Sequence, residues 1–314
     1  MHLKRYSGPL MLLLTSMIWG AAFVAQSVGL NYVGPFTLNS VRFLIAGVFL
    51  LPCIPLLRRA GFRSDTSGSQ KELLLGCLIC GVLLAVASSL QQIGLAYTTV
   101  SKAGFITALY VIIVPILGLF LGKKVRPLVW FCVVLSVVGL YLLCMAGPAS
   151  IGSGDLLVLL CALVFSLHIL AIDHFSRRVD GLKLSCFQFL ICGILCAGPM
   201  LALEHPAPGA ILAAWKPILY AGILSSGVGY TLQIIAQRRT DPTVASLILC
   251  MESVFSALFG WVLLHQSLSP RELTGCGLML ATILLAQLPG KKPASRELPA
   301  EAQADSPANP VKQT

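Results

Sequence analysis

Ten long apolar stretches decide what this sequence can fold into. A helix rises about 1.5 Å per residue, so roughly 20 apolar residues cross the hydrocarbon of a bilayer, which is about 30 Å thick. Charged residues make up only 11% of the chain, whereas a soluble domain carries about a quarter. The sequence therefore predicts an all-α integral membrane protein with ten transmembrane helices. The stretches cover approximately 9–30, 36–57, 73–97, 103–122, 127–146, 155–174, 184–203, 217–237, 243–264 and 272–288.

The two ends of the chain differ from the helices between them. Lys4 and Arg5 precede a leucine-rich run, as basic residues do in a secretory signal peptide. The run is too long for such a signal, and Phe23 stands where a small residue should precede a cut after Ala25. We therefore expect the first stretch to remain as a helix. Residues 290–314 are polar, rich in proline and free of aromatic side chains, which predicts a disordered cytoplasmic tail.

The net charge of +10 is compatible with nucleic-acid binding, but the positions of the basic residues indicate a membrane protein instead. With the N-terminus placed inside, 18 of the 22 lysines and arginines fall in the segments that alternate to the inside. Cytoplasmic loops of membrane proteins are enriched in this way. We therefore expect both termini in the cytoplasm, the lipid bilayer as a partner, and no nucleic acid. The remaining basic residues are Arg42, Lys102, Lys216 and Arg271.

The second half of the chain repeats the first. A shift of 146 residues lays Arg42–Gly47 over Gln188–Gly193. The duplicated unit holds five predicted helices, and because five is odd, the second copy begins on the opposite face of the membrane. We therefore expect two inverted halves, residues 1–146 and residues 147–289. Two such halves can exchange conformations around a central site, which favours transport.

The eleven cysteines all lie inside the predicted helices, which favours a packing role over disulfides. Cys77 and Cys80 have the spacing of a metal-binding or redox pair, but no nearby histidine or second pair accompanies them. We therefore expect no metal and no cofactor. The cysteines are Cys53, Cys77, Cys80, Cys132, Cys144, Cys161, Cys186, Cys192, Cys196, Cys250 and Cys276.

Polar side chains inside the predicted helices are candidates for contact with a solute, because such groups are costly in hydrocarbon. Glu252 lies near the middle of the ninth stretch. It either binds a cation or a proton, or it is a structural carboxyl that is hydrogen-bonded between helices. Arg42 lies about 9 Å deep in the second stretch. It either binds a carboxylate or phosphate of the solute or has a structural role near the interface. The candidate residues are Trp19, Arg42, Gln92, Tyr110, His168, Gln233 and Glu252.

The other candidates are neutral residues. A shift of 141 residues lays Gln92 over Gln233, so their amides would contact a solute from both halves or join helices. His168 would titrate near neutral pH or be a buried, hydrogen-bonded histidine. Trp19 and Tyr110 would form walls of a cavity, because aromatic rings with one polar tip bind amphipathic solutes.

An enzyme and a channel fit this sequence less well than a carrier. Gly152–Asp155 matches the GxGD string of intramembrane aspartyl proteases, but those enzymes need two facing carboxylates. A helix N-cap explains Asp155 better. The sequence contains no HExxH, GxSxG or P-loop motif. The predicted loops are too short for the re-entrant filter of a channel.

Four segments, taken in order, resemble a known family. They read WGAAFVAQ, GPFTLNSVRF, QQIGLAYTTVSKAGFITALYVIIVPILGLFLGKKV and GDLLVLLCALVFSLHILAIDHFSRR. Over about residues 9–288, the sequence is similar to bacterial EamA-type transporters of the drug/metabolite transporter superfamily. The resemblance implies ten helices, both termini inside, and export or exchange of amino acids, sugars or other metabolites. It also implies a central cavity lined mainly by the first, third, fourth, sixth, eighth and ninth helices.

The chain departs from that family at one recurrent place. Many members carry a glutamate shortly after the fourth and ninth helices, where this chain has Lys123 and Gln266. A proline is common where Ser253 follows Glu252.

Taken together, these inferences predict a multi-pass exporter of small metabolites such as amino acids in the cytoplasmic membrane. It would work by alternating access around a central cavity, as a monomer or a homodimer. The alternative is a proton-coupled exporter of drugs or other cations with the same fold.

Overall fold

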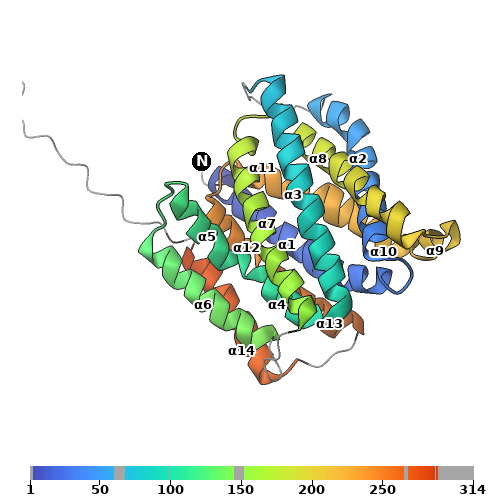
Figure 1. Ribbon diagram of the computed structural model, residues 1–314. Helices are drawn as coiled ribbons and strands as arrows, with labels where there is room; N and C mark the ends of the chain where they lie inside the picture. The colour runs from blue at the N-terminus through green and yellow to red at the C-terminus, as the bar shows by residue number, and fades with distance from the viewer. Residues whose placement is uncertain are drawn as a thin grey trace, which may run out of the picture.

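The computed structural model describes residues 3–59, 68–98, 100–144, 152–264, 268–286 and 288, and every regular element within them is a helix (Figure 1). The predicted tail and Gln266 lie outside the described residues. The first half contains α1 (Leu3–Gly29), α2 (Pro35–Arg59), α3 (Gln70–Tyr97), α4 (Val100–Ala108), α5 (Tyr110–Phe120) and α6 (Pro127–Cys144). The second half contains α7 (Ser153–Ser176), α8 (Gly181–Pro199), the π-helix η1 (Met200–Glu204), α9 (Pro208–Ala213), α10 (Trp215–Leu219), the π-helix η2 (Tyr220–Tyr230), α11 (Thr231–Gln237), α12 (Pro242–Leu249), α13 (Glu252–Leu264) and α14 (Pro270–Ala286).

The predicted class, an all-α membrane protein, is confirmed. Nine helical segments within the described residues are long and apolar enough to cross a membrane. The tenth predicted span corresponds to α14, which has 17 residues. Four of the spans consist of more than one helical element: α4 with α5, α8 with η1, α10 with η2 and α11, and α12 with α13.

Several helices begin at residues that cap their free backbone N–H groups. Ser69 accepts from the amide of Glu72, and the Glu72 carboxylate accepts from the amide of Ser69, which is a capping box at the start of α3. Asp180 and Asp241 are the N-caps of α8 and α12. Local sequence therefore fixes where these helices start.

The outer surface of the bundle is apolar. On α3, the side chains of Leu74, Leu78, Val82 and Val86 are all exposed, and residues four apart lie on one face of a helix. A continuous apolar stripe of this kind is a liability in water. It suits a helix that faces lipid.

Equivalent helices of the two halves pack on each other in a reciprocal way. A Cβ atom added to Gly47 of α2 would lie 2.5 Å from the Leu190 side chain, and one added to Gly193 of α8 would lie 2.7 Å from the Leu44 side chain. Leu44 and Leu190, like Gly47 and Gly193, are 146 positions apart in the sequence. Such an exchange of equivalent contacts is what a two-fold relation between the halves produces.

The direction of this packing shows that the second half is inverted. Ser40 Oγ, early in α2, donates to the carbonyl of Gly193 at 3.0 Å. Cys186 Sγ, earlier in α8, donates to the carbonyl of Gly47, later in α2, at 3.4 Å. The two equivalent helices therefore run antiparallel, as predicted from the odd number of helices in each unit.

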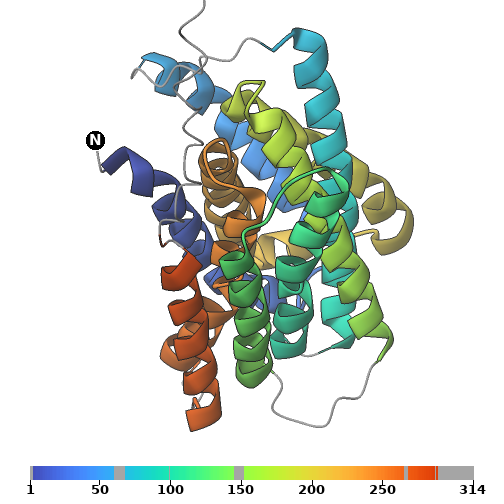
Figure 2. The same ribbon diagram turned by 90° about the vertical axis from the view of Figure 1, so that its left-hand side faces the viewer.

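A second pair of equivalent helices, α6 and α14, lies side by side along one edge of the bundle (Figure 2). A Cβ atom on Gly139 would lie 2.8 Å from Met279, and one on Gly275 would lie 2.6 Å from the Gly139 carbonyl. Among the remaining helices, α3 packs on α7, and α1 packs on α13, η2 and α11.

Replacing Gly193 with leucine tests the reciprocal contact. The new side chain has no space beside Leu44, and overpacking of this kind typically costs about 1–3 kcal/mol. We expect a lower thermal unfolding midpoint in detergent. Gly198→Leu, on the same helix with nothing within 4 Å, is the matched control. Equal midpoints for the two variants would show that α2 and α8 are not held together at this point.

Candidate functional site

Two spans are interrupted where the halves meet. α4 gives way to α5 at Leu109, and α12 gives way to α13 at Cys250–Met251. A shift of 143 residues lays Leu109 over Glu252, so the interruptions occupy equivalent places. α5 contacts α12, and α4 contacts α13. Interrupted helices at membrane depth are typical of solute sites in transporters, because they free backbone groups next to a cavity.

Tyr110 and Glu252 are the first residues of α5 and α13, directly after the interruptions. The Tyr110 hydroxyl donates to Glu252 Oε1 at an O···O distance of 3.1 Å. Both side chains are buried. Because one residue belongs to each half, this hydrogen bond joins the halves beside the cavity.

The cavity lies between the halves and has a volume of about 40 Å³, which is room for only a few water molecules. Six of the seven residues predicted from the sequence line it, and Gln92 does not. Arg42 adds α2 to the helices that the family resemblance implied. The lining residues are Trp19, Ala22, Phe23, Gln26, Arg42, Gln91, Thr107, Tyr110, Phe165, His168, Ile169, Ser225, Tyr230, Gln233, Leu249 and Glu252.

Arg42, Gln26 and Gln92 form a chain of side chains from α2 to α3. Arg42 Nη1 donates to Gln26 Oε1 at 2.5 Å, and Gln92 Nε2 donates to the same oxygen. Gln92 therefore lies behind Gln26, and its neighbour Gln91 reaches the cavity instead.

His168 and two aromatic residues form another wall. His168 Nε2 lies 3.2 Å from Gln188 Oε1, so the proton of the imidazole is on Nε2 when the amide oxygen accepts it. The ring of Tyr230 lies 6.0 Å from the imidazole and 4.5 Å from the ring of Trp19, measured between centroids. This wall offers both apolar surface and polar edges.

The π-helix η2 brings backbone carbonyls to the same region. Trp19 Nε1 donates to the carbonyl of Ser225, and Thr15 Oγ1 donates to that of Gly229, each at 3.1 Å. Small residues within η2 permit close approach, since a Cβ atom on Gly222 would lie 3.0 Å from the Arg42 carbonyl. Wide helical turns of this type occur frequently at functional sites.

Several polar atoms of the cavity residues have no hydrogen-bond partner among the described residues. They are Arg42 Nε, His168 Nδ1 and Gln233 Oε1. Buried polar atoms are nearly always paired in proteins. The cavity therefore presents both donors and acceptors that a polar solute can use.

Sequence reasoning missed Gln26, Thr107 and Ser225, which also line the cavity. For Gln26 a signal was available. Positions 19, 22, 23 and 26 of α1 all line the cavity, and this spacing defines one helical face. A polar residue on the face that begins at Trp19 is therefore a candidate from the sequence alone.

At one end of the bundle, Asp155 joins the halves. We call this end, defined by Thr98, Lys102 and Asp155, the Lys102 end. The Asp155 carboxylate accepts from Thr98 Oγ1 at 2.5 Å, from Lys102 Nζ at 3.1 Å and from the amide of Gly152 at 2.9 Å. Gly152 is the N-cap of α7, and Asp155 is the third residue after it. The prediction that Asp155 is itself the N-cap was therefore wrong by three residues, although the backbone contact is present.

A second carboxylate joins the halves at the same end. Glu204 of η1 accepts from the amides of Phe36 and Thr37 at 2.8 and 2.7 Å and from the Thr37 hydroxyl at 2.6 Å. These are free amides of the first turn of α2, where a negative charge is favourable.

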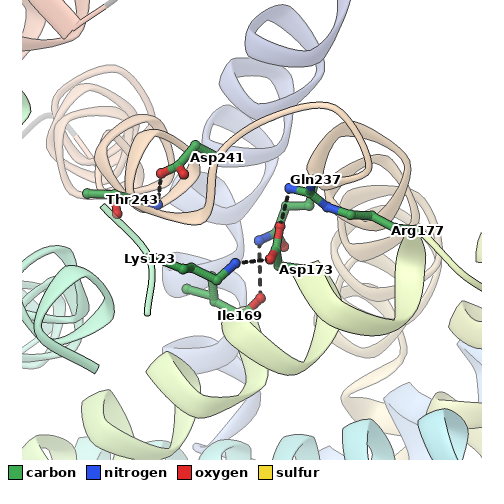
Figure 3. Close-up of polar contacts among 7 residues, drawn as sticks. All are labelled: Lys123, Ile169, Asp173, Arg177, Gln237, Asp241 and Thr243. Carbon is green, nitrogen blue, oxygen red and sulfur yellow. Dashed lines mark hydrogen bonds and ion pairs between the residues drawn. The ribbon is translucent and has the colours of Figure 1, made fainter. Parts of the chain in front are cut away.

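At the opposite end, Asp173 is the centre of a polar cluster that also joins the halves (Figure 3). We call this end, defined by Lys123, Asp173 and Arg177, the Lys123 end. Lys123, after α5, forms an ion pair with Asp173 of α7, and Arg177 Nη2 lies 2.7 Å from Asp173 Oδ1. One turn earlier, the carbonyl of Ile169 accepts from Gln237 Nε2 at 3.2 Å.

The sequence matches the EamA-like transporter family twice, over residues 6–145 and 152–288. A protein of Archaeoglobus fulgidus named "Uncharacterized transporter" is 31% identical over 288 residues, which are 91% of this chain and 87% of its own length. YedA of Escherichia coli K12, named an uncharacterized inner membrane transporter, is 24% identical over 278 residues, or 87% of this chain and 88% of its own. One crystal structure, 20% identical, covers 90% of this chain and 97% of its own with a TM-score of 0.74, which shows the same fold.

Removing the Tyr110 hydroxyl tests the bond between the interruptions. Tyr110→Phe leaves the buried Glu252 carboxyl without the hydroxyl that donates to it, and an unsatisfied buried group costs about 1–3 kcal/mol. We expect a lower unfolding midpoint in detergent. Tyr141→Phe, which removes a hydroxyl from the exposed side of α6, is the control. If both variants unfold like the wild type, Tyr110 and Glu252 do not stabilise the junction of the halves.

Proposed function

The chain belongs to the EamA-like transporter family, and from this we propose that it exports a small polar metabolite such as an amino acid. The observation that carries the proposal is the position of the cavity. It lies between two inverted halves, is lined by both, and holds polar atoms without partners in the described residues. A solute bound there contacts both halves at once.

Alternating access is the mechanism that we propose. A metabolite larger than a few water molecules does not fit the cavity as it stands, so the halves must separate for it to enter. Contacts between the halves exist at both the Lys102 end and the Lys123 end. We propose that one set opens while the other stays closed, so that the site faces one side of the membrane at a time.

We place the Lys123 end and both termini in the cytoplasm. The support for this orientation is the distribution of lysine and arginine in the sequence. The membrane would be the cytoplasmic membrane, which agrees with the description of the relative YedA. We further propose that the protein works as a monomer or homodimer.

A proton-coupled exporter of cations is the second candidate function. It is favoured by one observation, the buried carboxyl of Glu252 on the cavity wall. In this version a proton and a cationic solute would compete for Glu252.

Transport by the purified protein in proteoliposomes tests both candidates. A panel of amino acids, sugars and cationic dyes is measured with and without a pH gradient. Saturable uptake of a metabolite supports the first function, and dye uptake driven by the gradient supports the second. Glu252→Gln should remove the effect of the gradient if Glu252 carries the proton. No saturable transport of any panel member would contradict the proposal.

Weakening the Lys123 end tests its role as a contact that must open. Lys123→Ala leaves Asp173 paired with Arg177, and the contacts of Arg178 with Glu72 and Gly68 remain, so the fold should survive while one ion pair between the halves is lost. We expect faster amide hydrogen exchange, by up to about fivefold, at the ends of α5 and α7 near Asp173. Lys124→Ala removes an adjacent exposed lysine and should leave the exchange unchanged. Equal exchange in the two variants would mean that the Lys123 pair does not hold the halves together.

A further inference from the structure

Arg42 is a buried cation on the cavity wall that has no carboxylate partner in the described part of the chain. Its side chain belongs to a residue only 4% exposed, and none of the described acidic residues lies within ion-pair distance of it. Its hydrogen bond and its ring contact are both with neutral side chains. Nη1 donates to the amide oxygen of Gln26, and the guanidinium lies 4.5 Å from the ring of Phe43.

These contacts compensate the charge only in part. An amide and an aromatic face stabilise a guanidinium less than a carboxylate does, and Nε has no partner among the described residues. A charge that is taken out of water without a counter-charge destabilises a protein considerably. The contacts among the described residues therefore leave the charge of Arg42 only partly compensated.

A structural role at the membrane surface does not account for this geometry. An arginine that snorkels places its guanidinium in water or among head groups, whereas Arg42 is enclosed. The equivalent residue of the second half is Gln188, which is also buried and pairs with His168. The neighbouring residues of the two halves are alike, since the ring of Phe43 stacks on that of its equivalent Phe189 with 6.0 Å between the centroids. The helix pair therefore accommodates a neutral amide at this place.

We propose that Arg42 binds an oxyanion, the carboxylate or phosphate of the transported solute, and so selects against cations. This inference rests on the proposed transport function. Glu252 lines the same cavity, so a solute with an acidic group at Arg42 and a basic group elsewhere matches the charges of both. A solute that is only cationic meets an unneutralised guanidinium. Arg42 thus favours the metabolite function over the export of cationic drugs.

The charge difference between the halves also fixes the orientation of the solute. Arg42 has a neutral equivalent in Gln188, and Glu252 has a neutral equivalent in Leu109 under the shift of 143 residues. The two halves therefore contribute different charges to the cavity. The acidic group of the solute would point towards α2 in both the inward-facing and the outward-facing state.

Arg42→Gln tests the proposal, because it installs the residue that the second half already carries. In proteoliposomes loaded from a panel of neutral amino acids, small carboxylates, sugar phosphates and cationic dyes, we expect the wild type to transport oxyanion-bearing solutes. Transport of amino acids and small carboxylates would identify a carboxylate as the group that Arg42 binds. Transport of sugar phosphates would identify a phosphate. Arg42→Gln should weaken the apparent affinity for them by about thirtyfold or more. Arg42→Lys keeps the positive charge, so its apparent affinity for these solutes should fall less than that of Arg42→Gln.

Unfolding midpoints in detergent separate a binding role from a structural one. Without solute, Arg42→Gln should be as stable as the wild type or more stable, because it removes a buried charge that has no counter-ion. Acetate and inorganic phosphate should stabilise the wild type and not the variant. A destabilised variant with unchanged solute affinity would show that Arg42 is structural.

The possible outcomes distinguish this inference from the proposed function. Transport of cationic dyes alone, unchanged in Arg42→Gln, would overturn the role of Arg42 and leave a transporter. If no panel member is transported, the proposed function fails, and the stabilisation by acetate and phosphate decides the role of Arg42. Equal stabilisation of both proteins would then overturn it.

Discussion

The antiparallel packing of equivalent helices is the interaction on which the rest of this structure depends. α2 packs on α8 through Gly47 and Gly193, and α6 packs on α14 through Gly139 and Gly275. Lipid offers no hydrophobic force that would drive helices together, so close approach at small residues has to supply the attraction. These two contacts place one half upside down against the other. The interrupted helices consequently meet at the interface.

The cavity is built from two related halves that differ in part of their helices and in their side chains. Both halves carry an interrupted span at the same place, yet one interruption is followed by Tyr110 and the other by Glu252. The eighth span contains the π-helix η2, whereas its equivalent α3 is continuous. A duplicated fold supplies two related arrangements of the helices. The residues that differ between the halves make the two sides of the cavity chemically different.

Much of the fold could be predicted from the sequence, because it follows from the thermodynamics of lipid. The lengths of the apolar stretches predict the membrane-spanning helices. The odd number of helices in each duplicated unit predicts that the second half is inverted relative to the first. Polar side chains are costly to bury in hydrocarbon, and this cost identified Arg42, His168 and Glu252 as candidates from the sequence. All three line the cavity, and their roles stay predictions. The interruptions could not be predicted. Leu109 and Cys250 have no local signal for a break, so these breaks arise from tertiary packing. The π-helix η2 is rich in glycine and serine and packs against α1 and α2.

The central claim is that the two ends of the interface open in alternation, and distances across it test that claim most directly. Spin labels are attached to unnatural amino acids, because the chain contains eleven cysteines. One labelled pair occupies positions 124 and 178 at the Lys123 end, and the other occupies positions 97 and 209 at the Lys102 end. Pulsed electron resonance in nanodiscs should show two populations, and the solute should lengthen one distance as it shortens the other. A single fixed distance at both ends, with and without transported solute, would contradict the account.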